Sequence, residues 1–317
     1  MYPPQQVPAG HRRAQGANCE PGVSSSLFDC AQTGGSLRVK GTGLMLTKAG
    51  MCYVEHRCIR RGRHLRTLPQ VSPRSRVERL RLRGAWPGRV DITAGWAKAV
   101  ARPWNEDIEA VSLRLERGGA RFLGSCAHLV SEWSPEVLSP ATLPSASAVW
   151  HDAGFIETDR LLLMERDLNA VERPLSVIDA GGVEPIEELH QVDSEAFSPR
   201  WRLGRLGLAE SVTATNRSVV FRVGAEGRCV GFAITGVALG AGYLQRLAVS
   251  PIARGHGLGS DLVRVSLRWA RSQGARSMLV NTQVENVAAA SVYRRLGFTD
   301  VPGGLLLFKY APTGGAA

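Results

Sequence analysis

The stretch between Leu247 and Asp261 limits the possible folds of this chain more than any other part of its sequence. An apolar predicted strand ends at Pro251, and glycines follow at positions 255, 257 and 259. A helix is then predicted over Leu258–Arg271, with apolar residues at positions 258, 262, 265 and 269 on one face. The pattern predicts a strand, a glycine-rich loop and an amphipathic helix, in that order.

A loop of this composition indicates a binding site for an anion. It exposes consecutive backbone N–H groups at the N-terminus of a helix, where the helix dipole favours negative charge. Glycine is needed there because a Cβ would keep the backbone from closing around a phosphate. Physical chemistry alone therefore predicts a ligand that contains a pyrophosphate.

Two common nucleotide-binding motifs do not fit this loop. The dinucleotide fingerprint requires Gly-x-Gly-x-x-Gly, whereas residues 255–259 read Gly-x-Gly-x-Gly, and no acidic residue ends a strand about 20 residues later. The P-loop requires Gly-Lys-Ser or Gly-Lys-Thr, which is absent here. Neither motif accounts for the loop.

A second motif lies one predicted helix and one predicted strand further along the chain. Residues 254–259 read Arg-x-x-Gly-x-Gly, and residues 286–298 have Asn first, Tyr at 293 and Gly-Phe at the end. In this order, the two motifs resemble the acetyl-CoA loop and the downstream helix of GNAT N-acetyltransferases. The resemblance covers residues 175–311, and Val230–Gly297 is similar to bacterial protein N-terminal-alanine acetyltransferases.

The resemblance implies a domain that moves an acetyl group from its co-substrate acetyl-CoA to a primary amine of a small molecule or a protein N-terminus. Backbone groups of residues 247–249 would pair with the pantetheine arm, and the amide of Ala248 or Val249 would polarise the thioester carbonyl. Asn286 would bond the pantetheine or fix the loop. Tyr293 would protonate the departing thiolate, because a phenol pKa of about 10 is near that of an alkyl thiol. The expected cofactor-binding residues are Leu247, Ala248, Val249, Arg254, Gly255, His256, Gly257, Leu258, Gly259, Ser260 and Asn286, and the expected catalytic residue is Tyr293.

The sequence assigns no catalytic base. Where N-terminal-alanine acetyltransferases have a glutamate on the strand before the second motif, this chain has Asn281. Neutral amides at positions 245, 281 and 283 can hold a water but cannot take a proton. The carboxylates available on the predicted early helices are Asp193, Glu195 and Glu210, while Phe197, Trp201 and Arg202 are candidates for an acceptor pocket.

The first half of the chain resembles only the last part of the second half. Residues 149–155 and 292–298 both place an aromatic four residues before Gly-Phe, and an apolar strand is predicted to start soon afterwards, at Leu161 and at Leu305. The first half has no Arg-x-x-Gly-x-Gly loop. We therefore expect tandem GNAT-like domains of the α/β (α+β) class, each a mixed, mostly antiparallel twisted sheet flanked by helices, in which the first domain is degenerate.

The expected boundaries are a basic, disordered tail over 1–75, the degenerate domain over 76–168, a linker over 169–174 and the catalytic domain over 175–313. In the first half the pattern predicts strands over Val77–Leu82 and Val90–Ile92, a helix or strand over Asn105–Arg117, a helix over Ala120–Ser131 and a loop over Ser134–Ser147. In the second half it predicts helices over Pro185–Phe197, Trp201–Ser211, Leu258–Arg271 and Asn286–Leu296, and strands over Leu175–Ile178, Ser218–Val223, Cys229–Val237, Gly242–Val249, Met278–Thr282 and Leu305–Lys309.

Composition narrows the remaining choices. The net charge of +11 lies in residues 1–83, while the rest of the chain is balanced. We expect no nucleic acid partner, and binding of nucleic acid by the basic tail ranks last among the alternatives because no aromatic residues are interleaved with its charges. Six scattered cysteines indicate reduced thiols and a cytoplasmic protein. No segment is long and apolar enough to span a membrane. The spacing of Cys52, His56, Cys58 and His64 matches no common zinc finger, so no metal is expected. The alternative to an enzyme is a non-catalytic acyl-CoA sensor.

Overall fold

The computed structural model describes residues 44–47, 50–53, 80–174, 178–181, 185–225 and 228–311. Most of the predicted basic tail, including His56, Cys58 and His64, therefore lies outside the described residues. Within it, β1 (Leu44–Thr47) and β2 (Gly50–Tyr53) form an antiparallel strand pair that the sequence did not predict.

All other described strands belong to one mixed sheet with the order β3-β4-β5-β6-β7-β15-β8-β13-β12-β11-β10-β9, and β14 pairs with β8 beside this path. Neighbouring strands are antiparallel except for two parallel pairs, β6 with β7 and β12 with β13. The fold class predicted from the sequence, a mixed and mostly antiparallel sheet flanked by helices, is confirmed.

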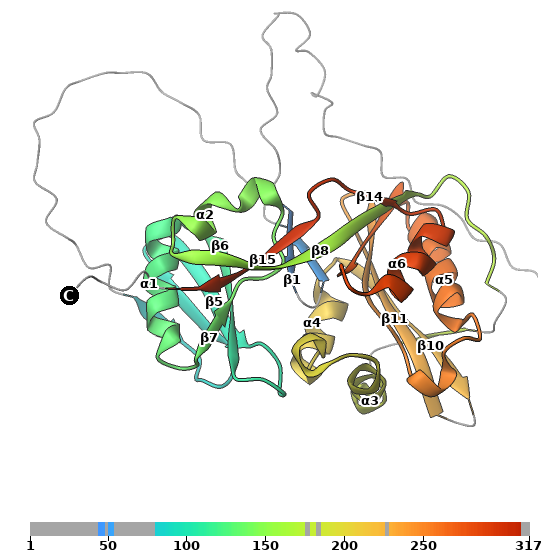
Figure 1. Cartoon of the computed structure of the whole chain (residues 1–317), viewed down its shortest axis with the longest axis horizontal. Coiled ribbons are helices and arrows are strands. Elements are labelled where there is room, and N and C mark those ends of the chain that lie inside the picture. Colours follow the sequence, from blue (N-terminus) through green and yellow to red (C-terminus); the bar gives the residue numbers. More distant parts are fainter. Residues whose placement is uncertain are drawn as a thin grey trace, which may run out of the picture. The chain divides into compact units, whose positions relative to one another are not determined.

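The N-terminal half contains one edge of this sheet, one long helix and two short helical turns (Figure 1). Its elements are β3 (Arg81–Arg83), β4 (Val90–Ala94), β5 (Ala97–Pro103), β6 (Ala110–Arg117), α1 (Ala120–Ser131), β7 (Glu136–Leu138), the 3-10 turn η1 (Pro144–Ala146) and α2 (Ala148–His151).

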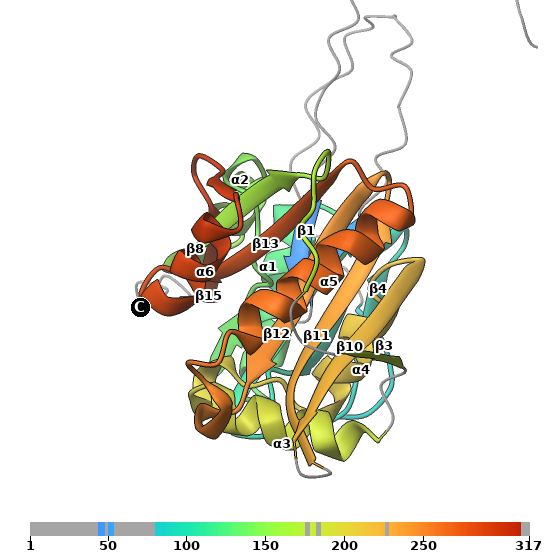
Figure 2. The same ribbon diagram turned by 90° about the vertical axis from the view of Figure 1, so that its right-hand side faces the viewer.

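The C-terminal half contains the other edge of the sheet, and α5 lies along β10, β11 and β12 (Figure 2). On the opposite face, α3 and α4 cover the same strands. The elements of this half are β9 (Asp179–Gly181), α3 (Ile186–Ala196), the 3-10 turn η2 (Pro199–Trp201), α4 (Arg205–Thr213), β10 (Arg217–Ala225), β11 (Arg228–Ala238), β12 (Ala241–Val249), the 3-10 turn η3 (Pro251–Ala253), α5 (Leu258–Ser272), β13 (Ser277–Gln283), α6 (Val287–Arg295) and β14 (Thr299–Asp300).

Two strands are exchanged between the halves, and Figure 1 shows them side by side. β8 (Phe155–Asp167) follows α2 of the N-terminal half but pairs with β13, from Leu161 opposite Gln283 to Asp167 opposite Ser277. β15 (Leu305–Tyr310) follows α6 of the C-terminal half but lies between β8 and β7. Each half of the sheet is thus completed by a strand from the other half.

The internal repeat predicted from the sequence has a counterpart where these strands begin. Gly154 and Gly297 both adopt positive φ, +87° and +78°, and each N–H donates to the carbonyl three residues earlier. Glycine suits both helix ends because the left-handed region costs it little. The predicted start of this strand at Leu161 is wrong, because β8 begins at Phe155 and pairs with β15 from that residue onward.

Two other features differ from the sequence prediction, and the structure decides one choice that the prediction left open. Residues 97–103 form β5, which the sequence did not predict, and β7 occupies part of the loop predicted over Ser134–Ser147. The choice left open for Asn105–Arg117 is a strand over Ala110–Arg117, because Val111, Leu113 and Leu115 alternate toward the core.

The buried face of α5 is shifted from the predicted one. Leu262 is fully buried as expected, but positions 258, 265 and 269 are only half-buried at its margins. Val263, Leu267 and Ala270 fill the core instead, together with Ser266, whose hydroxyl bonds the Leu262 carbonyl and the Thr235 hydroxyl. The prediction counted only apolar residues as buried, so it missed the face that contains Ser266, a polar residue whose burial is stabilised by hydrogen bonds.

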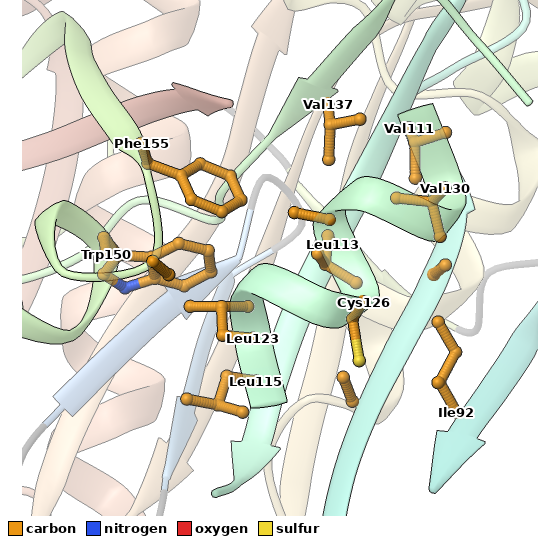
Figure 3. Close-up of a cluster of buried hydrophobic side chains, with 14 of the residues drawn as sticks. Ile92, Val111, Leu113, Leu115, Leu123, Cys126, Val130, Val137, Trp150 and Phe155 are labelled. Atoms are coloured by element: carbon orange, nitrogen blue, oxygen red, sulfur yellow. The ribbon is translucent and has the colours of Figure 1, made fainter. Parts of the chain in front are cut away.

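The core of the N-terminal half lies between its strands and α1 (Figure 3). Figure 3 shows Leu113 and Leu115 of β6 facing Leu123 of α1, with the Trp150 and Phe155 rings beside them. Leu306 and Phe308 of β15 belong to the same core, although they come from the far end of the chain. The exchanged strand is therefore part of the packing that holds the N-terminal half together.

We expect the substitution Phe308→Ala to destabilise the protein by about 3–5 kcal/mol, the usual cost of removing a buried phenylalanine. Phe308 is fully buried, stacks on the Trp150 ring at a centroid distance of 6.3 Å and meets the His151 ring edge-on. Urea unfolding followed by tryptophan fluorescence measures the change. Lys309→Ala is the control, since Lys309 forms an ion pair with Glu136 at 41% side-chain exposure, and a change below about 1 kcal/mol is expected. A loss for Phe308→Ala as small as that of the control would contradict the exchanged packing.

Candidate active site

β12 and β13 separate part-way along their length. They pair in parallel from Ala241 opposite Ser277 to Leu244 opposite Val280, and the pairing ends there although both strands continue. A bulge begins at the same point, because Ile234 of β11 faces Arg246 while Thr235 faces Leu244, which leaves Gln245 as the extra residue. Bulges bend a strand, so this one turns the end of β12 away from β13 and opens a gap in the sheet.

The glycine loop follows directly on the separated end of β12. Gly255 and Gly257 adopt φ of +84° and +80°, and a Cβ added to either would meet no protein atom within 4 Å. The first backbone bond of α5 runs from the Asp261 N–H to the Gly257 carbonyl. The N–H groups of residues 258–260 precede that bond and have no acceptor within the helix. The loop therefore combines an open cradle with free donors at a helix N-terminus.

Most of the residues predicted to bind the cofactor line one groove. It runs along the end of β12, past the glycine loop and onto the exposed side of α6. The predicted residues that line it are Leu247, Ala248, Val249, Arg254, Gly255, Gly257, Leu258, Gly259, Ser260 and Asn286. His256 is the exception, because it is exposed and lines a second groove with Glu195, Ser250 and Cys229.

Arg254 holds the loop by bonds to the backbone. Its Nε donates to the carbonyl of Val249 at 3.3 Å, and its Nη2 donates to the carbonyl of Ala196 at 3.1 Å. The guanidinium thereby ties the loop to the end of β12 and to the end of α3. Of the backbone groups of Val249, the bond to Arg254 uses the carbonyl and does not use the amide.

Asn286 and Tyr293 lie at opposite ends of α6, two turns apart. Asn286 caps the helix, since its Oδ1 accepts from the Ala289 N–H at 3.2 Å. Tyr293 is 4% exposed, and its ring packs edge-on against Phe298 with centroids 5.7 Å apart. Burial raises the pKa of the Tyr293 phenol well above its ordinary value, and the nearby Arg246 guanidinium opposes this with a smaller effect. The phenol is therefore protonated at neutral pH.

A cleft opens beside the groove, at the gap between β12 and β13. Its polar lining is made of neutral groups, the phenol of Tyr293 among them, and the Arg246 guanidinium is the one charged group among the described residues that line it. Among the described residues that line it, none is Asp, Glu, His, Lys or Cys. The residues with hydrogen-bonding side chains are Gln245, Arg246, Asn281, Thr282, Gln283, Asn286 and Tyr293, with the indoles of Trp104 and Trp201, and the apolar walls are Ala141, Leu161, Phe197, Leu244, Leu247, Val280, Ala289 and Leu307.

Arg246 is neutralised by Asp193, one of the carboxylates considered as a base. Its Nε lies 2.5 Å from Asp193 Oδ1, and the other Asp193 oxygen accepts from the Leu203 N–H at 2.6 Å. The guanidinium also donates to the Trp201 carbonyl and lies 3.5 Å from the centre of the Phe197 ring. Asp193 is fully buried, so separating this pair would leave an uncompensated charge in the interior. Both of its oxygens are engaged away from the cleft.

The other two carboxylates considered as bases also lie outside the cleft. Glu195 accepts from the Ser250 hydroxyl at 2.5 Å and from the Gln191 amide at 3.2 Å. Glu210 forms an ion pair with Arg102 of the N-terminal half at 2.9 Å. Neither residue lines the cleft, so the structure offers no carboxylate from the predicted set to take a proton there.

The N-terminal half supplies one wall of the cleft. Trp104 lines it and donates its indole N–H to the Arg200 carbonyl at 2.8 Å, while Ala141 and Leu161 line it nearby. The side-chain amide of Asn105 donates to the carbonyls of Pro199 and Arg202. These bonds dock the loop after β5 against the segment between α3 and α4.

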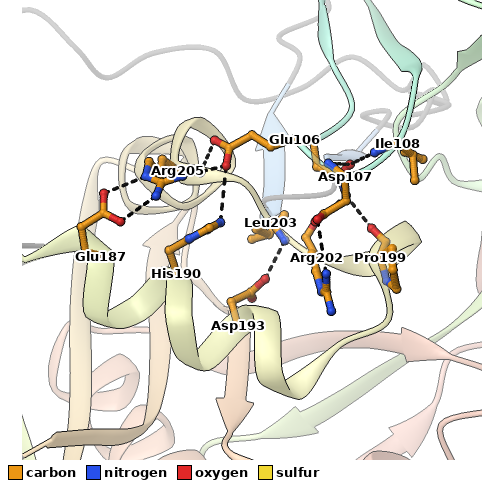
Figure 4. Close-up of polar contacts among 11 residues, drawn as sticks. Glu106, Asp107, Ile108, Glu187, His190, Asp193, Pro199, Arg202, Leu203 and Arg205 are labelled. Carbon is orange, nitrogen blue, oxygen red and sulfur yellow. Dashed lines mark hydrogen bonds and ion pairs between the residues drawn. The ribbon is translucent and has the colours of Figure 1, made fainter.

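Ion pairs strengthen the same contact (Figure 4). Glu106 lies 2.8 Å from Arg205 and 3.5 Å from His190, and Asp107 lies 3.3 Å from Arg202. Figure 4 shows these acidic groups facing basic groups of α3, α4 and their connection. Arg202, considered as a pocket residue, thus faces Asp107 and the Phe197 carbonyl instead of the cleft, whereas Phe197 and Trp201 do line it.

Sequence reasoning missed several lining residues. Ala289 and Val292 follow Asn286 at spacings of three and six residues, which places them near Tyr293 on one face of α6. This helical spacing could have predicted that they line the site. Arg246 adjoins the predicted pantetheine strand, but nothing local marks it as a cleft residue. Trp104 lies on a different half of the chain and gives no sequence signal at all.

The comparisons with known proteins agree with this geometry. The family model described as "Acetyltransferase (GNAT) family" matches residues 186–298, which contain the glycine loop, the separated strands and α6. Residues 186–298 belong to the GNAT family of acetyltransferases. Members of this family use acetyl-CoA as co-substrate.

Individual relatives add further detail. The chain is similar to a mycothiol acetyltransferase of Rhodococcus opacus, with 30% identity over 206 residues, 55% of this chain and 66% of the relative, slightly less than two thirds of its length. It is also similar to N-alpha-acetyltransferase 30 of Schizosaccharomyces pombe, with 40% identity over 57 residues, 18% of this chain and 38% of the relative. Among solved structures, a tandem GNAT protein from the clavulanic acid biosynthesis pathway is similar with a TM-score of 0.48 and 12% identity, over 70% of this chain and 81% of that one.

Two further observations concern the described residues only. They contain no group of three or more His, Cys, Asp or Glu side chains placed to hold a metal ion. None of their helices is both long and apolar enough to cross a membrane.

Proposed function

We propose that this protein is an N-acetyltransferase that transfers the acetyl group of acetyl-CoA to a primary amine. The observation that carries the proposal is the continuity of the glycine-loop groove with the cleft that contains Tyr293, because Phe197, Trp201, Leu247, Gln283, Asn286 and Ala289 line both. A ligand whose diphosphate lies on the loop would reach the gap between β12 and β13 with its other end. The relatives leave both a small molecule and a protein N-terminus open as acceptor.

The loop and β12 hold the co-substrate in this proposal. The N–H groups of residues 255–260 bind the diphosphate, supported by the α5 dipole. The free edge of residues 247–249 pairs with the pantetheine arm as an added strand would. The amide of Ala248 or Val249 donates to the thioester oxygen and stabilises the negative charge that develops there. Arg254 and Asn286 keep the loop and α6 in place.

Tyr293 acts as the general acid. The amine nitrogen forms a bond to the acetyl carbon while the carbon–sulfur bond breaks, and the phenol gives its proton to the departing sulfur. Its raised pKa keeps that proton in place at neutral pH. Direct transfer is supported because none of the described residues that line the cleft is Cys, and burial raises the pKa of the Cys229 thiol, which lies in the second groove.

The N-terminal half has a structural role in this proposal and binds no CoA. Only Gly118 and Gly119 separate β6 from α1, whereas residues 250–257 separate β12 from α5. The short connection cannot form a phosphate loop. Trp150 occupies the position that Tyr293 has in the other half and is fully buried.

We expect Gly257→Val to abolish measurable acetyl-CoA binding, because a β-branched side chain at φ of +80° distorts the loop and fills the cradle. Isothermal titration calorimetry measures the affinity. Gly274→Val is the matched control, since Gly274 also has a positive φ of +86° and open space around it but does not line the groove. Retained affinity in Gly257→Val, or equal loss in both variants, would remove the loop from the proposed binding site.

We expect Tyr293→Phe to lower kcat roughly tenfold or more and to leave the acetyl-CoA dissociation constant nearly unchanged, because only the proton donor is removed. In the parent protein, deprotonation of Tyr293 should lower activity only above about pH 10, because burial raises its pKa beyond the ordinary tyrosine value. Thiol release from acetyl-CoA with a panel of primary amines measures both effects. An unchanged kcat would exclude Tyr293 as the acid, whereas acetyl-CoA binding by the parent without turnover of any amine would indicate a sensor.

A further inference from the structure

Gln245 carries an unpartnered, buried oxygen in the cleft. The side chain lines the cleft and only 7% of the residue is exposed. Its Nε2 donates to the Thr215 hydroxyl oxygen at 3.2 Å. Among the described residues, none provides a donor for its Oε1, although that atom is buried. Because a buried acceptor without a partner is destabilising, this oxygen favours a ligand that brings a hydrogen-bond donor.

The orientation of the carboxamide is fixed by its neighbours. The Thr215 hydroxyl donates its single proton to the Arg217 carbonyl at 2.9 Å. Its oxygen can therefore only accept from Gln245, and the donor of the two Gln245 atoms is Nε2. The oxygen of the carboxamide is consequently the atom left without a partner.

Gly236 of β11 makes room for this arrangement. A Cβ at that position would collide with the Thr215 hydroxyl oxygen and with Gln245 Nε2. The bulge in β12 contributes as well, because Gln245 is its extra residue. Backbone and side chains of three strand and loop segments thus hold the Gln245 carboxamide in the lining of the cleft, with its oxygen unpartnered.

We propose that Gln245 Oε1 binds the nitrogen of the acceptor amine, and that the acceptor is an uncharged primary amine on an apolar or aromatic group. This inference rests on the proposed function. One N–H of the amine donates to Gln245 Oε1, which turns the nitrogen lone pair toward the acetyl carbon. The second N–H proton is lost to water after the nitrogen–carbon bond has formed, since none of the described lining residues offers a carboxylate to receive it.

The chemistry of the cleft selects this class of acceptor. A cationic ammonium would need a carboxylate, and none of the described lining residues has one, while Arg246 adds positive charge that Asp193 already balances. Trp104, Phe197 and Trp201 offer aromatic walls to an apolar substituent. Polyamines such as spermidine fit neither property.

The test uses phenethylamine as the acceptor probe and the full chain. We expect Gln245→Leu to lower kcat/KM for phenethylamine roughly tenfold or more, with the acetyl-CoA dissociation constant within about twofold, because Gln245 does not line the co-substrate groove. Thr215→Val should cause a smaller loss by freeing the carboxamide to rotate. Thr215→Ser retains the accepting oxygen and is the matched control, with nearly parental kinetics.

The pH profile separates acceptor binding from a merely structural role. In the parent protein the acidic limb of kcat/KM should lie at the amine pKa and shift when benzylamine replaces phenethylamine. Gln245→Glu places a carboxylate in the cleft, so the ammonium form should bind and the limb should move to lower pH. A variant that is only less stable would keep the parental limb.

Each outcome has a distinct meaning. Turnover of phenethylamine by the parent with unchanged kinetics in Gln245→Leu would overturn the inference and leave the proposed function intact. Acetylation of spermidine in preference to phenethylamine would overturn the acceptor class in the same way. Failure of the parent to bind acetyl-CoA in calorimetry would overturn the proposed function and this inference together.

Discussion

The separation of β12 from β13 is the constraint on which the rest of the site depends. Both strands keep a partner on their outer edges, β11 for β12 and β8 for β13, so the sheet remains continuous while the gap opens. The bulge at Gln245 starts the separation and also places the Gln245 side chain in the cleft. In the proposed function, this one irregularity of the backbone creates both the free edge that pairs with the co-substrate and the carboxamide that binds the acceptor.

The exchange of β8 and β15 explains why a half without a glycine loop matters to the site. β8 supplies the strand next to β13, and the loop after β5 supplies Trp104 and the contacts to the segment between α3 and α4. The cleft is thus lined by residues of both halves, whereas the described residues that line the groove along β12 and the glycine loop all belong to the C-terminal half. We infer that the N-terminal half lost its own ligand site but remains necessary as part of the scaffold.

The sequence predicted those parts of the site that consist of contiguous patterns. The glycine loop, the start of α5 and the pair Asn286 and Tyr293 depend on local spacing, and the structure places them along one groove and cleft. His256 was assigned to the groove with its neighbours, but it lines the second groove, beside Glu195 and Ser250. The role of each residue remains a prediction.

The remainder could not be predicted because it depends on long-range packing. Trp104 meets the cleft only through a contact across 96 residues of chain. The exchange of β8 and β15 cannot be predicted from the alternation of apolar residues along these strands. Each strand would bury the same alternate side chains whether it paired within its own half or with the other half. Asp193 was a reasonable base from its position on the early helix. Its ion pair with Arg246, which engages the carboxylate away from the cleft, is visible only once α3 is placed against β12.

The central claim is that the loop around His256 binds a diphosphate and directs a thioester into the gap between the separated strands. A crystal structure of the full chain with acetyl-CoA tests this most directly. The account predicts the diphosphate on the amides of residues 255–260, the pantetheine along residues 247–249 and the acetyl carbon between Gln245 and Tyr293. Density for the diphosphate away from the loop, or a pantetheine arm outside the gap, would contradict it.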